Sequence, residues 1–370
     1  MKLSCSRSAL AAAFQTVSGV IPTRTPKPIL QNVKLEATAG QAVLIGTDQE
    51  VGIRYRLAEA NIEVAGEVLL PTNRVLSILR EMQGDAVFIE TTDSGTVISG
   101  ERAKYKLGAE NPAEFPLVAE FDEQNAVTIA ANVLKQMIQR TVFATDTEST
   151  RYALGGVLVE IKGESIVMAA TDTRRLAVMR GQCAASGKPA SENAVPVVPS
   201  KALALIERTL SDNDTPVSIA IRNNDVLVKT PLATIYSRLV EGRFPKYQDV
   251  IPAQSTSTVE LVVGPFYSAV RQAQIVTSEE SRGVDFEIAP GLMTLASRAA
   301  EIGESKVELP ISYDGAPLVI TFDPRYVAEF LRVLEPEQSI RLELTDAESA
   351  AVFRTEDGYI YIVMPLSRDR

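Results

Sequence analysis

The chain has 370 residues, of which 45% are hydrophobic and 23% charged, and this length suggests two or three globular domains with buried cores. It contains no histidine, which excludes Ser-His-Asp and Cys-His catalysis and histidine-ligated zinc, and its two cysteines, Cys5 and Cys183, cannot form a disulfide framework. The 47 acidic and 37 basic residues give a formal charge of −10, a balance that taken alone argues against a nucleic-acid partner.

The sequence carries no sign of secretion or membrane insertion. Residues 1–7 lack the long apolar run of a signal peptide, and no later stretch is long and apolar enough to cross a membrane. The two cysteines fit a reduced compartment. We therefore expect a cytoplasmic protein without a membrane partner.

The first third of the chain reads as one α+β unit. Apolar spacings of three and four predict a helix over residues 7–20, and alternation predicts strands at 29–36 and 43–48. The second of these strands ends in Thr47-Asp48. A second helix is predicted over 72–83, with Thr72 as its N-cap, before further β runs close the unit.

The same order of elements returns in the middle of the chain. A helix is predicted over 131–143, and two strands follow at 154–160 and 167–172, the second ending in Thr171-Asp172. A second helix over 199–210 has Ser200 as its predicted N-cap. The unit therefore repeats the first one.

A third, looser copy completes the chain. It has predicted helices over 264–277 and 324–334, the latter capped by Asp323, and a strand at 293–298 that lacks the aspartate. The first two copies are 124 residues apart, measured from Asp48 to Asp172. We predict three homologous α+β domains spanning residues 1–122, 123–252 and 253–370, each with two helices packed on antiparallel sheets.

The charge is unevenly distributed between these elements. The six predicted helices carry ten basic and three acidic residues, a net charge of +7, so the rest of the chain carries −17. Solvated helix faces usually mix the two signs. The segregation favours one basic surface made by helices of all three units, which would bind a phosphate backbone without reading bases.

No cofactor or catalytic site is expected. Phosphate-cradling glycine motifs and four-ligand metal patterns are absent from the sequence. Asp48 and Asp172 could be proposed as a magnesium-binding pair, but their equivalent turn positions favour a structural role in which each carboxylate accepts backbone N–H groups. We therefore expect no metal, no cofactor and no catalysis.

Several segments in order resemble the bacterial DNA polymerase III beta subunit family, the β sliding clamps, along the full length of the chain. They are Lys27–Leu30, Gly46–Asp48, Arg151-Tyr152, Ala170–Asp172 with Arg175–Val178, Glu241–Pro245 with Tyr247, and Tyr361–Leu366. Each segment alone is a weak signal, but their order and spacing are specific.

The resemblance implies a head-to-tail homodimer in which three domains per subunit form a six-domain ring around duplex DNA. Such a ring would hold the replicative polymerase on DNA as a processivity subunit without catalysis of its own. The implied partners are the DNA, without sequence specificity, the clamp loader complex, the polymerase alpha subunit and other proteins that carry a clamp-binding motif.

The resemblance also implies roles for individual residues. The family's DNA-contact positions correspond to Arg24, Arg74, Arg80, Arg151, Tyr152 and Lys201. Its partner-peptide pocket corresponds to Leu154, Thr171, Thr173, Arg174, Arg175, Leu176, Pro245, Val250, Tyr326, Ile362, Val363, Met364, Pro365 and Leu366. Four departures stand out: Ala153 replaces the second residue of a tandem Tyr-Tyr, Glu148 stands where a neutral amide can occur, Arg174 stands where a Gly-His pair is sometimes seen, and Asp249 stands where a basic residue can occur.

A ring also needs a closing interface between subunits. Arg102, Lys104 and Lys106 alternate along one predicted strand and therefore share a face. Glu301, Glu304 and Glu308 lie in the equivalent part of the third unit. We expect this basic edge to meet that acidic edge in the dimer, with apolar contacts from Tyr105, Ile275 and Val276.

Two other classes of function remain as alternatives. One is a magnesium-dependent hydrolase or nuclease that uses Asp48 and Asp172, which the loss of the aspartate in the third copy disfavours. The other is a repeat scaffold that binds only proteins, which would not need net-positive helices.

Overall fold

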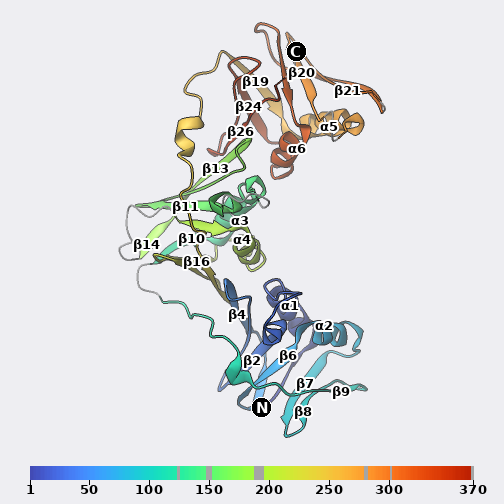
Figure 1. The fold of residues 1–370 in the computed structure, drawn as a ribbon, viewed down its shortest axis with the longest axis vertical. Helices are drawn as coiled ribbons and strands as arrows, with labels where there is room; N and C mark the ends of the chain where they lie inside the picture. Colours follow the sequence, from blue (N-terminus) through green and yellow to red (C-terminus); the bar gives the residue numbers. More distant parts are fainter. Residues whose placement is uncertain (123–125, 147–151, 187–195, 279–281, 301, 368–370) are drawn as a thin grey trace. The chain divides into compact units, whose positions relative to one another are not determined.

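The computed structural model describes residues 1–122, 126–146, 152–186, 196–278, 282–300 and 302–367 (Figure 1). The chain divides into two compact units. The first consists of Met1–Lys135 and Cys183–Leu239, and the second of Gln136–Gln182 and Val240–Arg370. Every helix among the described residues is too short or too polar to span a bilayer.

The first repeat has the order strand, helix, five strands, helix, three strands. Its elements are β1 (Lys2–Ser6), α1 (Arg7–Val17), β2 (Asn32–Thr38), β3 (Gln41–Thr47), β4 (Val51–Leu57), β5 (Asn61–Val64), β6 (Gly66–Pro71), α2 (Thr72–Glu81), β7 (Ala86–Thr92), β8 (Gly95–Ser99) and β9 (Lys104–Leu107).

The second repeat has the same order of helices and strands, and 3₁₀ turns follow its first helix as η1 (Pro28–Gln31) follows α1 in the first repeat. Its elements are β10 (Ala126–Ala130), α3 (Ala131–Gln139), η3 (Val142–Ala144), η4 (Tyr152–Gly155), β11 (Gly156–Lys162), β12 (Ser165–Thr171), β13 (Arg175–Gln182), β14 (Ala184–Ser186), β15 (Val197–Pro199), α4 (Ser200–Glu207), β16 (Pro216–Ile221), β17 (Asp225–Lys229) and β18 (Ala233–Arg238).

The third repeat has four strands between its helices, where the described residues of the first two have five. After the 3₁₀ turn η5 (Tyr247–Val250) its elements are β19 (Ser257–Val262), α5 (Val263–Ala273), η6 (Gln274–Val276), β20 (Val284–Ala289), β21 (Leu292–Ala299), β22 (Gly303–Pro310), β23 (Leu318–Phe322), α6 (Pro324–Arg332), β24 (Ser339–Leu344), β25 (Ala351–Thr355) and β26 (Ile360–Val363). The three repeated α+β units predicted from the sequence are confirmed.

In the first unit, one antiparallel sheet runs through parts of two repeats. Its order is β14-β10-β16-β17-β18-β4-β3-β2-β6, and a second sheet has the order β5-β1-β7-β8-β9. Strand β4 of the first repeat pairs with β18 of the second, with Ile53 opposite Ile235. Backbone hydrogen bonds therefore join the two repeats.

The second unit repeats this arrangement. One sheet contains the order β11-β12-β13-β26-β25-β24-β19, and another has the order β22-β21-β20-β23. Strand β13 of the second repeat pairs with β26 of the third, with Leu176 opposite Ile362. Strands β4 and β13 hold equivalent places, since each follows a Thr-Asp turn, and β18 and β26 each end their repeat.

Two equivalent strands lie at sheet edges. Strand β22 is the third copy of β4 and β13, and β9 is the first-repeat copy of β18 and β26. Each has one neighbouring strand among the described residues and presents its other backbone edge unpaired.

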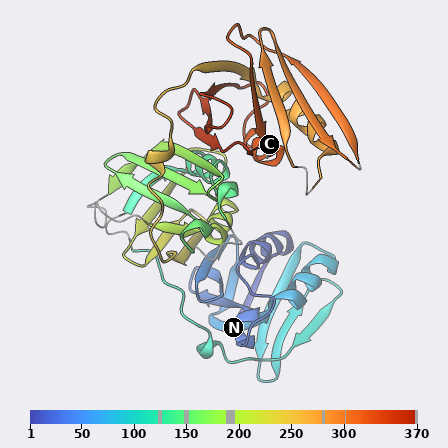
Figure 2. The same ribbon diagram turned by 45° about the horizontal axis from the view of Figure 1, so that its top comes forward.

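The helices bury one apolar face each. Helices α1 and α2 lie side by side on one face of the strands of their repeat (Figures 1 and 2). Leu10, Phe14 and Val17 of α1 are fully buried, as the three- and four-residue spacing predicts. Helices α5 and α6 also pack together, and Phe266 and Phe330 are fully buried there.

One of the three predicted N-caps is confirmed. The carboxylate of Asp323 accepts the N–H of Arg325 at 3.0 Å at the start of α6. The predictions for Thr72 and Ser200 are wrong, because both are the first residues of their helices. The Thr72 hydroxyl instead donates to the carbonyl of Gln31 at 2.7 Å, a tertiary acceptor that the local sequence does not reveal.

Candidate functional site

The two Thr-Asp turns are built alike. In the first, Asp48 Oδ1 accepts the N–H groups of Glu50 and Val51 at 2.9 and 2.7 Å, and Gln49 has a positive φ of 80°. The Thr47 hydroxyl donates to the carbonyl of Val51 at 2.8 Å. The side chains thus supply the hydrogen bonds that close the turn.

The second turn uses the same bonds. Asp172 Oδ1 accepts the N–H groups of Arg174 and Arg175 at 2.9 and 3.0 Å, and Thr173 has φ 77°. The predicted structural role of both aspartates is confirmed. The described residues contain no group of three or more histidine, cysteine, aspartate or glutamate side chains that could hold a metal ion.

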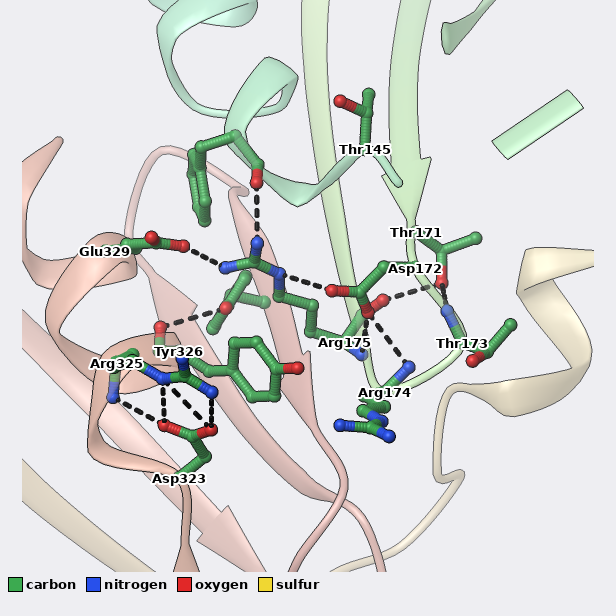
Figure 3. A network of polar contacts seen from close by, with 12 residues as sticks. Thr145, Thr171, Asp172, Thr173, Arg174, Arg175, Asp323, Arg325, Tyr326 and Glu329 are labelled. Carbon is green, nitrogen blue, oxygen red and sulfur yellow. Dashed lines mark hydrogen bonds and ion pairs between the residues drawn. The ribbon is translucent and has the colours of Figure 1, made fainter. Parts of the chain in front are cut away.

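Arg175 lies at the centre of a polar network beside this turn (Figure 3). Its Nε donates to Asp172 Oδ2 at 2.9 Å, one Nη donates to the carbonyl of Phe143 at 2.7 Å, and the other forms an ion pair with Glu329. The guanidinium carbon lies 4.6 Å from the centre of the Tyr326 ring. The network therefore joins β13, η3 and α6 within the second unit.

The Arg175 guanidinium stays charged although its side chain is only 9% exposed. Burial disfavours the charged form, but the nearby Tyr361 hydroxyl and the Glu329 carboxylate outweigh it and raise the pKa of Arg175. Arg175 was predicted as a pocket residue. The structure places it beneath the surface, where it fixes the residues that surround it.

A stack of aromatic rings supports the network. Tyr361 on β26 is fully buried, stacks on Phe330 at 4.8 Å and donates its hydroxyl to the carbonyl of Tyr326 at 2.9 Å. Burial raises the pKa of Tyr361, so this hydroxyl remains a donor. The backbone of Tyr326, at the start of α6, is thereby held against β26.

The chain continues past β26 along the same side of the turn. The N–H of Met364 donates to the carbonyl of Arg174 at 2.8 Å, and the N–H of Leu366 donates to the carbonyl of Thr321 at 2.8 Å. Residues 171–176 and 361–366, far apart in the sequence, are therefore adjacent in the structure.

The fourteen predicted pocket residues all lie in the second unit, but they differ in exposure. The exposed ones are Thr173, Arg174, Pro245, Val250 and Met364, and the partly exposed ones are Tyr326, Pro365 and Leu366. The buried ones are Leu154, Thr171, Arg175, Leu176, Ile362 and Val363. A partner could touch the first two groups directly, whereas the buried group would only support them.

The predicted DNA-contact residues lie in the first unit, apart from two. Arg74 and Arg80 on α2 and Arg24 in the loop after α1 are exposed, and they form no ion pair with the described residues. Lys201 on α4 is also exposed, but its Nζ lies 2.5 Å from the carboxylate of Asp48. Arg151 and the side chain of Tyr152 lie outside the described residues.

Fewer basic side chains on the helices are free to bind a ligand than the count from the sequence suggests. Arg7 donates to the carbonyls of Gly84 and Leu79, and Arg140 is buried against Asp357 at 2.5 Å. These two cations cannot face a ligand. The basic surface predicted for all six helices is therefore smaller than +7, because tertiary contacts engage part of it.

The residues predicted for the closing interface lie on or beside the edge strands β9 and β22 and in the 3₁₀ turn η6. Lys104 and Lys106 are exposed on β9, whereas Arg102 precedes the strand, contrary to the prediction. Ile275 in η6 is 74% exposed, and Val276 and Tyr105 are partly exposed.

The opposite edge is not purely acidic. On β22, Glu304 lies 3.0 Å from Arg298, and Glu308 lies 2.9 Å from Lys306. Glu301 lies outside the described residues. The predicted charge complementarity is therefore weakened by pairs within the chain, and the unpaired backbone edge of β22 is the stronger feature.

Models of three domains of the DNA polymerase III beta subunit match the chain in succession. The N-terminal domain matches residues 1–119, the central domain 128–246 and the C-terminal domain 248–367. The chain belongs to the DNA polymerase III beta subunit family. The family resemblance inferred from the sequence is confirmed.

Named relatives and solved structures of this family cover the same length. The beta sliding clamp of Pseudomonas aeruginosa is 30% identical over 373 residues, covering 99% of this chain and all of the relative. That of Vibrio cholerae is 27% identical, covering 99% of this chain and all of the relative. A crystal structure of the P. aeruginosa beta subunit, 29% identical, matches with a TM-score of 0.89, covering 99% of this chain and all of that one. One of the Bacillus subtilis sliding clamp, 26% identical, gives 0.90 with 99% of each covered.

Sequence analysis did not identify four residues that bind Arg175 or Arg140 within the second unit: Phe143, Glu329, Asp357 and Tyr359. Glu329 and Phe143 bind Arg175, and Asp357 binds Arg140. Arg140 is 3% exposed, and its backbone carbonyl accepts the Tyr359 hydroxyl at 2.6 Å. These partners are 32 to 219 residues apart in the sequence, so local spacing carries no signal for them.

Proposed function

We propose that the protein is a sliding clamp: a head-to-tail dimer whose six domains encircle duplex DNA and tether the replicative polymerase. The observation that carries this proposal is the way in which each repeat joins the next. Strand β4 pairs with β18, and its equivalent β13 pairs with β26, both antiparallel.

The same kind of strand pairing would form the interface between subunits. Strand β22 is the third copy of β4 and β13, and among the described residues its edge away from β21 has no partner; β9 is the corresponding last strand, and its edge away from β8 is also unpaired there. Pairing β22 of one subunit with β9 of another would continue the series. Because the two surfaces differ, the contact is heterologous, and two copies close a ring when the rotation between them is 180°.

The DNA would be held by phosphate contacts alone. Arg24, Arg74, Arg80, Arg151 and Lys201, with Tyr152, are the residues proposed to contact it, on or near helices that carry more basic than acidic side chains. Contacts to phosphate do not distinguish bases, so the ring would slide along the duplex.

Partner proteins would bind at the exposed residues around the Arg175 network. The clamp loader complex, the polymerase alpha subunit and other proteins with a clamp-binding motif are the proposed partners. A tethered polymerase stays at high effective concentration near the primer end, which gives processivity. We propose that the protein has no catalytic activity of its own, and that its domains span residues 1–122, 123–252 and 253–370.

Crosslinking tests the head-to-tail contact directly. Both native cysteines are buried, so thiols placed at Lys106 on β9 and Lys306 on β22 are the accessible ones. With a bis-maleimide, we expect the double variant Lys106→Cys/Lys306→Cys to form covalent dimers, while each single variant stays monomeric under denaturing conditions. Dimers from either single variant would show an isologous contact and refute this arrangement.

Retention on DNA tests the clamp itself. After loading by a clamp loader and ATP, we expect the protein to remain on nicked circular DNA and to leave the same DNA once it is linearised. Equal loss from circles and linear DNA would refute topological binding.

A further inference from the structure

Asp48 places a fixed negative charge at the first Thr-Asp turn. Its Oδ1 accepts the N–H groups of Glu50 and Val51 at 2.9 and 2.7 Å, and its own N–H donates to the Val51 carbonyl at 3.1 Å. The Asp48 side chain is 18% exposed. Because Oδ1 is engaged in the turn, Oδ2 is the oxygen that can bind a further group.

The two Thr-Asp turns use this second oxygen differently. Asp172 Oδ2 accepts the Nε of Arg175, three residues further along the chain, at 2.9 Å. The equivalent of Arg175 in the first repeat is Val51, which carries no charge. Asp48 Oδ2 lies instead 2.5 Å from Nζ of Lys201, on α4 of the second repeat. The first turn thus takes its cation from a helix, and from a residue that is proposed to contact DNA.

The Lys201 ammonium is held on two sides. Besides Asp48, its Nζ lies 3.5 Å from the carbonyl of Val20, just after α1, and the side chain is 49% exposed. Lys201 is the second residue of α4, at the end of a helix where the dipole disfavours a cation, so a carboxylate is a favourable partner there. A phosphate that binds Lys201 has to compete with this carboxylate.

The other proposed DNA contacts in the first unit differ from Lys201 in this respect. Arg24, Arg74 and Arg80 are exposed and form no ion pair with the residues that the structure describes. Each of them can neutralise a phosphate and release a counterion from DNA, whereas the Lys201–Asp48 pair has no net charge to offer.

We propose that Asp48 weakens the grip of the protein on DNA by neutralising Lys201, so that Lys201 binds a phosphate only when it leaves Asp48. This inference rests on the proposed contact between Lys201 and DNA, and it adds the residue that sets the strength of that contact. Asp48 is a positioning residue, since it holds the ammonium and need not touch DNA. Weak phosphate contacts favour sliding because each step along the duplex has to break them.

A double-mutant cycle tests the inference. The full-length wild type, Lys201→Ala, Asp48→Asn and the double variant are titrated against a fluorescein-labelled duplex at several salt concentrations, and the association constant K is measured by anisotropy. The asparagine side chain keeps an oxygen that can accept the two N–H groups of the turn, but it has no charge. We expect Asp48→Asn to bind DNA about two- to fivefold more tightly, as for the loss of an exposed ion pair, and to steepen the slope of log K against log salt by up to about 0.9. In the double variant this gain is absent.

Two further variants make the test specific. Glu50→Gln removes an equal charge two residues away, from an exposed side chain that pairs with Arg238, and we expect it to give no gain that depends on Lys201. In the wild-type background, Lys201→Ala should reduce the salt slope by less than half as much as Arg80→Ala, and this comparison does not depend on the folding of Asp48→Asn. Equal reductions would show that Lys201 binds phosphate as freely as Arg80 and would overturn the inference.

The remaining outcomes separate this inference from the proposed function. If Asp48→Asn tightens binding equally with and without Lys201, the carboxylate repels DNA directly and the inference is wrong. If neither Asp48→Asn nor Lys201→Ala changes binding while Arg80→Ala weakens it, the inference is wrong and the proposed DNA contacts stand. If Arg74→Ala and Arg80→Ala also bind DNA like the wild type, the proposed DNA contacts fail and this inference fails with them.

Discussion

Replacing Arg175 with alanine removes the centre of the network that joins the second and third repeats. The side chain is 9% exposed and binds Asp172, Glu329 and the carbonyl of Phe143. Breaking a buried ion pair from one side costs about 3–5 kcal/mol. The Glu329 side chain is 37% exposed and can be rehydrated, so we expect the lower end, about 3 kcal/mol.

The neighbouring residue provides the control. Arg174→Ala removes the same side chain from an exposed position without partners among the described residues, and we expect a change within about 0.5 kcal/mol. Arg175→Lys keeps the charge, but its compact ammonium lacks the planar fork of donors that binds Asp172, Glu329 and the Phe143 carbonyl together, so it should fall between the two alanine variants.

Hydrogen exchange measures this cost locally, which matters because a chain of three domains need not unfold in one step. Amides of β13 and β26 that exchange through local opening should exchange about 100-fold faster in Arg175→Ala. If Arg175→Ala and Arg174→Ala exchange alike at these strands, the Arg175 network does not stabilise the junction and the reasoning is wrong.

Three further predictions concern stability, assembly and DNA binding. Burial alone would raise the pKa of Asp357, but the hydrogen bonds from Thr355 and Arg140 outweigh it and hold the pKa below its usual value. The ionised Asp357 carboxylate therefore stabilises the fold at neutral pH, and this contribution is lost as pH falls below about 4. Urea midpoints of wild type and Asp357→Asn should therefore differ at pH 7 and converge in acid; a constant difference would contradict the ion pair. Ile275→Asp places a charge in the proposed interface, and analytical ultracentrifugation should show monomers at micromolar concentration with unchanged circular dichroism, whereas intact dimers would exclude Ile275 from the contact. Replacing Arg74 and Arg80 together with alanine should lower the slope of log K against log salt for DNA binding by up to about two, and an unchanged slope would mean that neither contacts phosphate.

The repeat was predictable because its signals are local. Helix periodicity, the Thr-Asp turns and the Asp323 cap each depend on residues within a few positions of one another, so they are legible in one sequence. The cap predictions for Thr72 and Ser200 failed for the opposite reason: the Thr72 hydroxyl binds the distant Gln31 carbonyl.

The candidate sites were predictable only in part. The family motifs identified Arg174, Arg175 and Met364, but they could not separate the exposed Arg174 from the buried Arg175. That difference depends on Glu329 and Phe143, which other elements bring to Arg175.

The sequence by itself determined that this protein has no histidine chemistry, three α+β repeats and helices richer in basic than acidic residues. It could not say which charges are free, since an ion pair depends on distance in space and not on composition. The tertiary structure turned Arg7 and Arg140 inward, paired Lys201 with Asp48, and left β9 and β22 as unpaired edges. These contacts could not be predicted from the sequence because hydrogen bonds and ion pairs form only between groups that folding brings within about 3 Å of each other.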